Sequence, residues 1–471
     1  MSELAIGAKL AAVDLKNDDR VKKAKELLVE ALREKSDAIT SVRPPQESLE
    51  SEYSSLLEKF GAIRGNNLFF PYLSSGIGNG PFIELADGSV KLDFITGIGV
   101  HGFGHSHPML VEAGVDAIIT DTVMQGNLQQ GSDSYEIAKL LTETACESGA
   151  KLKHCFLSTS GAMANENSLK MAFQKNAPAN RVIAFEHCFA GRTLALSQLT
   201  DKAKNRVGLP ETIAVDYIPF FDPDDPKGST ERSLGCLKEL VHRYPGKHAL
   251  LWMELIQGEG GYYPGDKNFF RKLVDFGHRN NIAFIADEVQ TFGRTTRPFA
   301  FQHFELDDVV DIVTIGKISQ VCATLFTDEY KPKPGLISQT FTGSSWAIVA
   351  GHRILSGLIE NGHYGADGKN QRLFEKFAGG LKDIASRHPD AISGPYGCGG
   401  MVAFTPFDGT MKKTRELVTR LYHAGLMSFS AGAAPVRIRF LMPIGCVTDD
   451  HIDLACQILE QTIVEIKNDS K

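Results

Sequence analysis

Residues 282–290 of this chain read IAFIADEVQ, and residues 309–317 read VVDIVTIGK. Each stretch is a mostly apolar run that ends in a charged residue, Asp287 in the first and Lys317 in the second. Such runs predict buried parallel strands, because a strand that is covered on both faces is apolar along its whole length. Neighbouring parallel strands would place the carboxylate and the amine at the same edge of one sheet, where open α/β folds bind their ligands.

A carboxylate and an amine at such an edge fit one cofactor in particular. Pyridoxal 5′-phosphate (PLP) needs an acid beside its ring nitrogen and a lysine for its aldehyde. We therefore expect Asp287 and Lys317 to belong to a PLP site. A nucleotide-dependent oxidoreductase is disfavoured, because no G-x-G-x-x-G motif follows an early strand.

Length and composition bound the architecture. A chain of 471 residues exceeds one ordinary core. We expect an N-terminal helix and irregular segment at 1–80, a large PLP-binding domain at 81–345 and a small α+β domain at 346–471. The net charge of −7 argues against a nucleic-acid-binding protein. No apolar run reaches the ~18 residues of a membrane span. The eight cysteines are scattered along the sequence, which favours a reduced, cytoplasmic protein.

Apolar periodicity predicts alternating strands and helices from about residue 82 onward. Strands are expected at 82–85, 154–157, 182–185, 249–255, 283–287 and 309–315, with helices at 162–175 and 268–280 between some of them. This alternation predicts an α/β fold with a mostly parallel sheet covered on both faces. After residue 346, helices are expected near 346–361, 370–388 and 450–467, and strands near 400–405 and 436–441.

A possible anion site follows the strand expected at 154–157. Residues 158–162 read STSGA and lead into the helix at 162–175. Backbone N–H groups at a helix start bind anions, so Ser160, Gly161 and Ala162 are interpreted as a phosphate-binding turn. The alternative is an ordinary helix cap with Ser160 at the N-cap position. The neighbouring Asp287 and Lys317 strands favour the phosphate.

Other strand ends carry weaker signals. In HCFAGRT at 187–193, Phe189 could stack on a planar cofactor and Arg192 could bind a carboxylate. The simpler interpretation is that Phe189 is a core residue and Arg192 a surface residue. Glu259, in ELIQGEGG at 254–261, is equally well a solvated turn residue. Arg439 fits a substrate carboxylate or a structural salt bridge. No metal site is expected, because GHSHP at 104–108 lacks further ligands at suitable spacing.

Taken together, these segments closely resemble the class III (ω-amino acid) aminotransferases, which are fold type I PLP enzymes. The resemblance runs from about residue 82 to residue 464. It rests on GHSHP at 104–108, SGA at 160–162, ELIQGEGG at 254–261, DEVQ at 287–290, TFTGS at 340–344 and RFLMP at 439–443. Within the family, GKISQVC at 316–322 looks more like the lysine 6-aminotransferase and 4-aminobutyrate aminotransferase branches.

The resemblance implies roles for the cofactor residues. Lys317 would bind the PLP aldehyde, Asp287 the ring nitrogen and Gln290 the ring hydroxyl, while Phe189 would stack on the ring. Gly161 and Ala162 would hold the phosphate, with Thr340 contributed by the neighbouring subunit. That last contact implies a homodimer with shared active sites.

The resemblance also implies the substrates. The amino donor would be an ω-amino acid of the lysine, ornithine or 4-aminobutyrate type, or an amine, and the acceptor a 2-oxo acid such as 2-oxoglutarate. Arg439 would bind the acceptor's α-carboxylate, Glu259 would neutralise Arg439 when no carboxylate is present, and Arg192 would serve the other carboxylate. Alternatives are a PLP-dependent aminomutase, racemase or decarboxylase, or a non-catalytic binding protein of the same fold.

The sequence departs from the family pattern at four places. Ala190 replaces a histidine or tryptophan, and Met163 replaces a common glutamate. The DEVQTFGR stretch lacks one glycine, and Ile318 with Ser319 replaces a glycine-rich run after Lys317. Three of the four lie near the expected pocket, so they put the substrate in doubt more than the cofactor.

Overall fold

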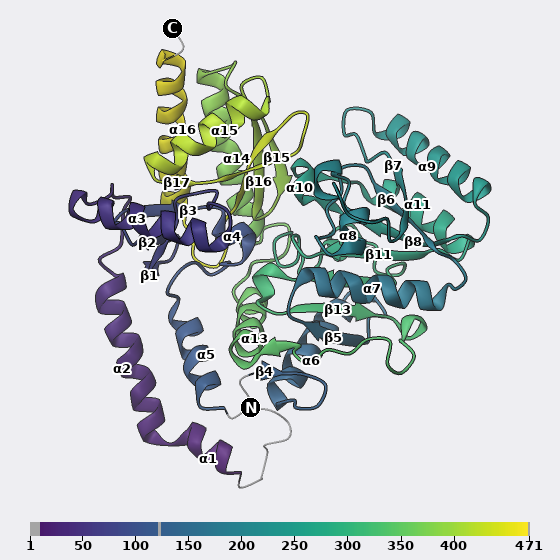
Figure 1. The fold of residues 1–471 in the computed structure, drawn as a ribbon, viewed down its shortest axis with the longest axis horizontal. Coiled ribbons are helices and arrows are strands. Elements are labelled where there is room, and N and C mark those ends of the chain that lie inside the picture. Colours follow the sequence, from purple (N-terminus) through teal and green to yellow (C-terminus); the bar gives the residue numbers. More distant parts are fainter. Residues whose placement is uncertain (1–9, 121–123, 470–471) are drawn as a thin grey trace. The chain divides into compact units, whose positions relative to one another are not determined.

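The computed structural model describes residues 10–120 and 124–469 (Figure 1). Contacts divide them into two compact units. Unit 1 holds residues 116–368 together with Leu10, and unit 2 holds residues 11–115 and the chain from 369 onward. Among the described residues, no helix combines the length and the apolar character that crossing a membrane requires.

Unit 1 is built on a seven-stranded sheet of order β5-β13-β12-β11-β8-β6-β7. The strands are β5 (His154–Ser158), β6 (Arg181–Phe185), β7 (Ala214–Ile218), β8 (His248–Met253), β11 (Ala283–Glu288), β12 (Ile312–Ile315) and β13 (Cys322–Phe326). Strand β13 runs antiparallel to both of its neighbours, whereas β12, β11, β8, β6 and β7 run parallel. The mostly parallel sheet expected from the sequence is confirmed.

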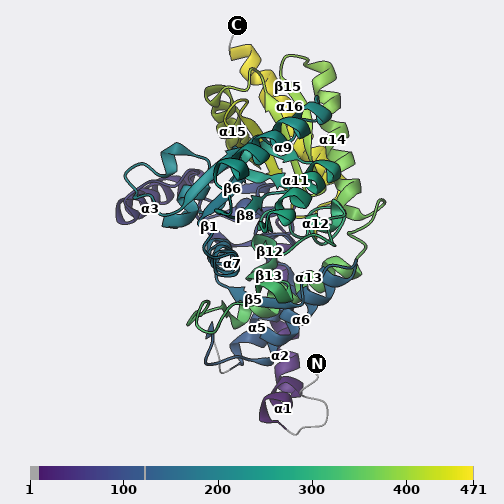
Figure 2. The same ribbon diagram turned by 90° about the vertical axis from the view of Figure 1, so that its right-hand side faces the viewer.

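Side-chain alternation along the strands covers both faces of this sheet. Trp252 and Ile285 lie in one buried cluster with Leu169 of α7 (Gly161–Lys175). Phe185 points to the opposite face, because successive strand residues alternate, and its ring stacks on Phe269 of α11 (Lys267–Arg279) at a centroid distance of 5.5 Å. Helix α9 (Pro226–Arg243) lies beside α11 (Figure 2).

The remaining helices of unit 1 flank the edge near β5. Helix α6 (Ser132–Cys146) contacts β5 and also packs on α13 (Ser345–Glu360). Shorter elements complete the unit: α5 (Pro108–Ile118, which spans the boundary), β4 (Met124–Gln125), α8 (Leu194–Leu199), β9 (Ile256–Gln257), α10 (Gly258–Gly261), β10 (Tyr263–Pro264), α12 (Ala300–His303) and β14 (Gly343–Ser344).

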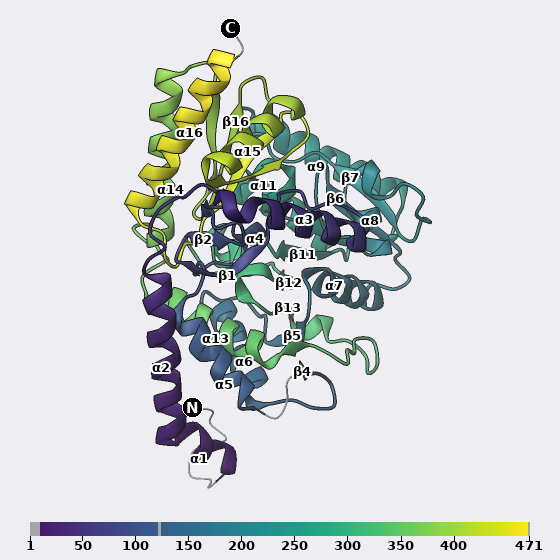
Figure 3. The same cartoon turned by 60° about the vertical axis from the view of Figure 1, so that its left-hand side comes forward.

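Unit 2 contains two four-stranded sheets. One has the order β15-β16-β19-β18 and is antiparallel: β15 (Ile392–Cys398), β16 (Met401–Pro406), β18 (Phe429–Ala431) and β19 (Arg437–Leu441). The other has the order β1-β2-β3-β17: β1 (Ser74–Asn79), β2 (Phe82–Leu85), β3 (Val90–Asp93) and β17 (Leu426–Met427). The helices of unit 2 are α1 (Ala11–Asn17), α2 (Asp19–Ser36), α3 (Glu47–Arg64), α4 (Thr96–Gly99), α14 (Lys369–Arg387), α15 (Met411–Ala424) and α16 (Asp449–Asp469). Helices α14 and α16 run side by side (Figure 3).

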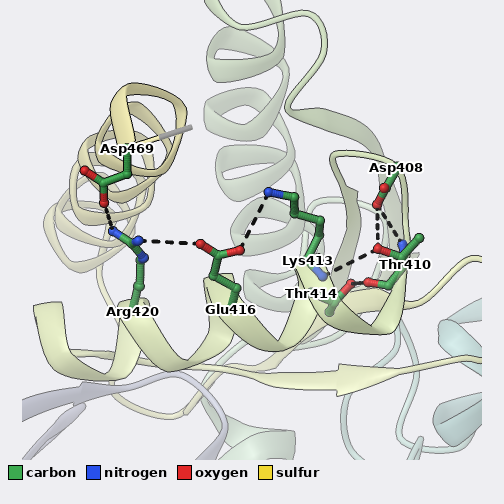
Figure 4. Close-up of polar contacts among 7 residues, drawn as sticks. All are labelled: Asp408, Thr410, Lys413, Thr414, Glu416, Arg420 and Asp469. Atoms are coloured by element: carbon green, nitrogen blue, oxygen red, sulfur yellow. Dashed lines mark hydrogen bonds and ion pairs between the residues drawn. The ribbon is translucent and has the colours of Figure 1, made fainter. Parts of the chain in front are cut away.

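Helix α15 shows how the sequence sets a helix start and its exposed face (Figure 4). Thr410 is the N-cap and accepts a hydrogen bond from the backbone N–H of Lys413 at 3.5 Å, which satisfies one N–H that has no partner inside the helix. Further along, Glu416 pairs with Lys413 at 3.7 Å and with Arg420 at 3.5 Å, and Arg420 also reaches Asp469 at 2.6 Å. These i,i+3 and i,i+4 pairs each add a few tenths of a kcal/mol.

The N-terminal region departs from the sequence expectation. Residues 47–64 form helix α3 rather than irregular chain, and Gly65 ends it in the left-handed conformation with φ +78°. The strand expected at 82–85 forms, but it belongs to an antiparallel pair with β3 and not to the parallel sheet. The stretch expected at 309–315 is a strand only from residue 312.

The units also divide the chain differently from the three expected segments. Strand β17, near the C-terminus, pairs in parallel with β3, which draws the segment before residue 116 into unit 2. Helix α13 packs on α6 and therefore belongs to unit 1, although the sequence suggested a boundary at 346.

Candidate active site

Asp287 lies buried near the C-terminal end of β11. Its carboxylate accepts hydrogen bonds from the Val289 backbone N–H at 3.0 Å and from Asn165 Nδ2 at 2.9 Å. Burial raises the pKa of Asp287 to about 6, while these hydrogen bonds and the ammonium of Lys317 act in the opposite direction. A buried carboxylate of this kind gains from a nearby cation.

Lys317 reaches the same edge from the neighbouring strand. Asp287 is in register with Thr314 of β12, three residues before Lys317. Lys317 opens a single 3₁₀ turn with φ +57°, and Gln320, just after that turn, has φ +60°. Left-handed conformations cost a non-glycine residue of the order of 1 kcal/mol and are concentrated at functional sites, where the surrounding structure holds them.

Val289 joins three of the motifs. A Cβ atom at Gly161 would lie 2.7 Å from Val289 Cγ1, and one at Gly316 would lie 3.2 Å from the same atom. The start of α7 can therefore approach the DEVQ segment this closely only with glycine at 161, and the lysine turn is tightly packed on the same valine at Gly316.

The first turn of α7 keeps donors available. Ser160 is its N-cap, and its Oγ accepts a hydrogen bond from the Met163 N–H at 3.2 Å. The N–H groups of Gly161 and Ala162 have no acceptor within the helix, because the first turn has none to offer. The structure thus shows Ser160 as a helix cap, and it leaves the two N–H groups beside it without an acceptor inside the helix, as a phosphate-binding turn requires.

A second buried carboxylate was not singled out from the sequence. Glu254 accepts hydrogen bonds from the Phe189 N–H at 2.8 Å and from the Gly258 N–H at 3.0 Å. Burial and the Asp287 carboxylate raise its pKa to about 8. Its signal was visible, since ALLWME at 249–254 is an apolar run that ends in an acid, just as IAFIAD does.

Asn165 was missed as well. Its Nδ2 donates to the Ala190 carbonyl at 2.7 Å as well as to Asp287, so it ties the Phe189 loop to the acid. Its Oδ1 is buried and accepts no hydrogen bond from the described residues. The available signal was an asparagine inside a predicted helix, where it is a poor helix former.

Glu259 belongs to the tight turn at Gly258–Gly261, and Gln290 packs against that turn. A Cβ atom at Gly258 would lie 2.5 Å from Gln290 Oε1, so the turn packs directly on Gln290. Glu259 forms an ion pair with Lys202 at 3.8 Å, and both side chains are about three-quarters covered, with 20% and 25% exposed. No sequence pattern indicated Lys202.

Two expected residues of unit 1 lie outside this cluster, and a third belongs to unit 2. The Arg192 guanidinium lies 6.0 Å from the centre of the Phe189 ring, and the residue is exposed. Thr340 is exposed, and within the described chain no hydrogen bond joins its side chain to Gly161 or Ala162. Arg439 belongs to unit 2, where it is fully buried with its guanidinium 5.7 Å from the centre of the Phe429 ring.

The family described as aminotransferase class-III matches residues 69–463. An acetylornithine aminotransferase from Bacillus subtilis is 30% identical over 399 residues, which are 82% of this chain and 93% of the relative. One from Caldanaerobacter subterraneus is 28% identical over 404 residues, or 83% and 94%. The chain belongs to the class III aminotransferases.

Solved structures agree on the fold. Lysine aminotransferase from M. tuberculosis superposes with a TM-score of 0.77 and 22% identity, covering 86% of this chain and 98% of its own. Ornithine aminotransferase from Toxoplasma gondii gives a TM-score of 0.74 and 22% identity, covering 90% and 100%. The protein is thus a transaminase of PLP fold type I, as the sequence predicted.

The residues present fit PLP, the cofactor of this family. The N–H groups in the first turn of α7 have no acceptor inside the helix and suit a phosphate, and buried Asp287 suits a protonated ring nitrogen. Lys317 supplies the amine at the same sheet edge. When bound, PLP contributes an aldehyde that links to amines and a ring that withdraws electrons.

Proposed function

We propose that this transaminase is an ω-aminotransferase. It takes the amino group from an ω-amino acid of the lysine, ornithine or 4-aminobutyrate type, or from an amine, and passes it to a 2-oxo acid, most simply 2-oxoglutarate. The observation that carries the proposal is the pairing of β11 with β12, which brings Asp287 and Lys317 to one edge. Relatives of this chain are named for acetylornithine, lysine and ornithine, which all carry an ω-nitrogen.

Each of the proposed cofactor-binding residues has its own role. Lys317 Nζ would hold the aldehyde, and the same amine would remove a proton from the substrate carbon that bears nitrogen. Asp287 keeps the ring nitrogen protonated, and Asn165 keeps Asp287 in place. Gln290 would contact the ring hydroxyl, Phe189 would stack on the ring, and Gly161 with Ala162 would bind the phosphate.

Substrate carboxylates need cations. We assign the acceptor's α-carboxylate to Arg439 and the second carboxylate to Arg192, because a planar guanidinium binds a carboxylate through two hydrogen bonds. Glu259 has a role in only one of the two half-reactions. It supplies a negative charge at the α-carboxylate position when the amino donor has no carboxylate to place at that position.

We further propose a cytoplasmic homodimer in which Thr340 binds the cofactor phosphate of the partner subunit. All eight cysteines are free thiols, which suits a reducing compartment. Thr340 lies beside an exposed apolar surface: Leu128 is 98% exposed and Phe341 53%, and their segments are joined by a hydrogen bond from the Asn127 N–H to the Gln339 carbonyl at 3.3 Å. Contiguous exposed apolar surface is typical of protein–protein interfaces, and these two side chains would contribute to one.

A spectroscopic titration tests the reaction and the donor class together. The absorbance of the bound cofactor should bleach on addition of an ω-amino acid and return on addition of 2-oxoglutarate. A racemase or a decarboxylase would convert an amino acid without needing the 2-oxo acid, and that result would reject transamination. Borohydride reduction and peptide mapping should place the cofactor on Lys317, and a label on another lysine would overturn that assignment.

A further inference from the structure

We propose that Glu254 is a positioning residue that passes the charge state of Asp287 on to the loop that stacks on the cofactor ring. Glu254 holds the Phe189 loop (residues 187–193) and the Gly258 turn. When the cofactor's ring nitrogen neutralises Asp287, Glu254 releases a proton and its hold on both segments tightens. This inference rests on the proposed pairing of Asp287 with the ring nitrogen.

Glu254 and Asp287 come at matching places along two neighbouring strands. Strands β8 and β11 are parallel, and their last pair in register is Met253 with Ala286. The next residues along the two strands are Glu254 and Asp287, and both are buried, with 6% and 5% of their surface exposed. A second negative charge is costly in such a place, because the loss of water and the like charge nearby both disfavour it.

Hydrogen bonds tie both acids to one short piece of the Phe189 loop. Glu254 Oε2 accepts from the Phe189 N–H at 2.8 Å. The carbonyl of the next residue, Ala190, accepts from Asn165 Nδ2 at 2.7 Å, and Asn165 also donates to Asp287 at 2.9 Å. The loop is thus held directly by one acid and, through Asn165, by the other.

Glu254 also holds the turn that packs on Gln290. Its Oε1 accepts from the Gly258 N–H at 3.0 Å, and a Cβ atom at Gly258 would lie 2.5 Å from Gln290 Oε1. One carboxyl group therefore joins two segments with proposed cofactor contacts. Both hydrogen bonds are stronger when the carboxyl group is ionised, because charge-assisted hydrogen bonds are roughly twice as strong as neutral ones.

The charges around Glu254 decide which form it takes in the cofactor-free protein. Burial and the Asp287 carboxylate raise its pKa to about 8, and the Glu259 carboxylate acts in the same direction. The nearby Cys188 stays a neutral thiol, because burial raises its pKa well above the ordinary value. A cation at Asp287 offsets the stronger of the two repulsions, so the pKa of Glu254 falls and its proton passes to the buffer.

Calorimetry of PLP binding to the cofactor-free protein counts this proton without any turnover. Titrations in buffers of different ionisation enthalpy give the number of protons released per chain. At about pH 7.5, we expect wild type to release about half a proton more than Glu254→Gln, because glutamine cannot ionise. PLP affinity should fall about tenfold in Glu254→Gln, because one amide oxygen replaces two acceptors.

Glu239→Gln is the matched control, because Glu239 is an exposed residue of α9. This variant should match wild type in proton count and in PLP affinity. Hydrogen exchange measures the loop itself. In the PLP-loaded protein, the amides at 187–193 should exchange about fivefold faster in Glu254→Gln than in wild type or Glu239→Gln.

An Asp287→Asn background shows whether the two acids are coupled. The charge that opposes ionisation of Glu254 is absent there, so Glu254→Gln should change the proton count by less than about 0.2 per chain. Equal proton counts in wild type and Glu254→Gln would overturn the inference, and so would a difference that persists undiminished in Asp287→Asn. The proposed pairing of Asp287 fails separately, if Asp287→Asn by itself leaves the proton count at the wild-type value.

Discussion

Asp287 and Glu254 are two carboxylates buried in one unit, and a charge on Asp287 raises the cost of ionising Glu254. Asp287 is the one that Asn165 and Val289 hold as an acceptor. For Asp287→Asn we expect PLP to remain bound but proton removal from the substrate to slow by far more than tenfold, because the ring nitrogen loses its anionic partner. Single-turnover kinetics measures this step. A rate within about tenfold of wild type, or ~1.4 kcal/mol in the barrier, would mean that Asp287 is not that partner.

The raised pKa of Glu254 makes the stability of the cofactor-free protein depend on pH. Folded Glu254 keeps its proton up to about pH 8, whereas the unfolded side chain releases it near its ordinary pKa of 4.5. Between these values the folded state binds more protons, so the free energy of unfolding falls as pH rises, with a slope of up to about 1.4 kcal/mol per pH unit from this group.

Glu254→Gln should therefore reduce the loss of stability between pH 5 and pH 8. Urea unfolding of the cofactor-free protein at a series of pH values provides the measurement. Some slope should remain, because burial also raises the pKa of Glu288 to about 8. Equal slopes in wild type and variant would contradict a protonated Glu254 in the folded protein.

At the scale of elements, the sequence predicted what local pattern controls. Strands β11 and β12 and helix α7 follow from continuous apolar runs and a serine-glycine helix start, so the amino-acid sequence alone was enough to place Asp287 and Lys317 at one sheet edge. Strand β13 was missed, because its five residues, CATLF, are too short for periodicity to distinguish a strand from a loop. The links from Asn165 to Asp287 and from Lys202 to Glu259 join distant segments, which no local pattern encodes.

The first turn of α7 yields a prediction about glycine. In Gly161→Ala, the new methyl group would meet Val289 Cγ1 at 2.7 Å, and the phosphate-binding turn would have to move away from the DEVQ segment. We expect PLP affinity to fall by about tenfold or more, since charge-assisted hydrogen bonds are worth roughly 1.5–3 kcal/mol. Fluorescence titration of the cofactor-free protein with PLP measures the change.

Gly379→Ala is the matched control for that variant. Gly379 lies inside α14, and a Cβ atom there meets no other atom within 4 Å. Alanine should raise the free energy of unfolding by about 0.5–1 kcal/mol and leave PLP affinity unchanged, because it removes backbone freedom from the unfolded chain. If Gly161→Ala behaves like Gly379→Ala, the close approach at Val289 does not shape the phosphate site.

At the scale of the whole molecule, one of the two units is assembled from distant parts of the chain. Unit 2 combines residues before 116 with residues after 368, since β17 joins β3. A boundary placed at 346 from the change in the pattern of helices and strands could not anticipate this, because such pairing depends on long-range contacts. Arg439 belongs to unit 2, whereas the other cofactor and substrate candidates belong to unit 1.

Thr340 carries the prediction about assembly. It is exposed, and its segment is tied to residues 124–129 through β14 and β4, beside the exposed side chains of Leu128 and Phe341. We expect a dimer in sedimentation, and we expect Thr340→Ala to weaken PLP binding by roughly 1.5–3 kcal/mol through loss of one phosphate hydrogen bond while the dimer persists. Leu128→Asp, in contrast, should dissociate the dimer and lower PLP affinity together, because a buried, unpaired carboxylate at an interface is costly. A fully active monomer would contradict shared active sites.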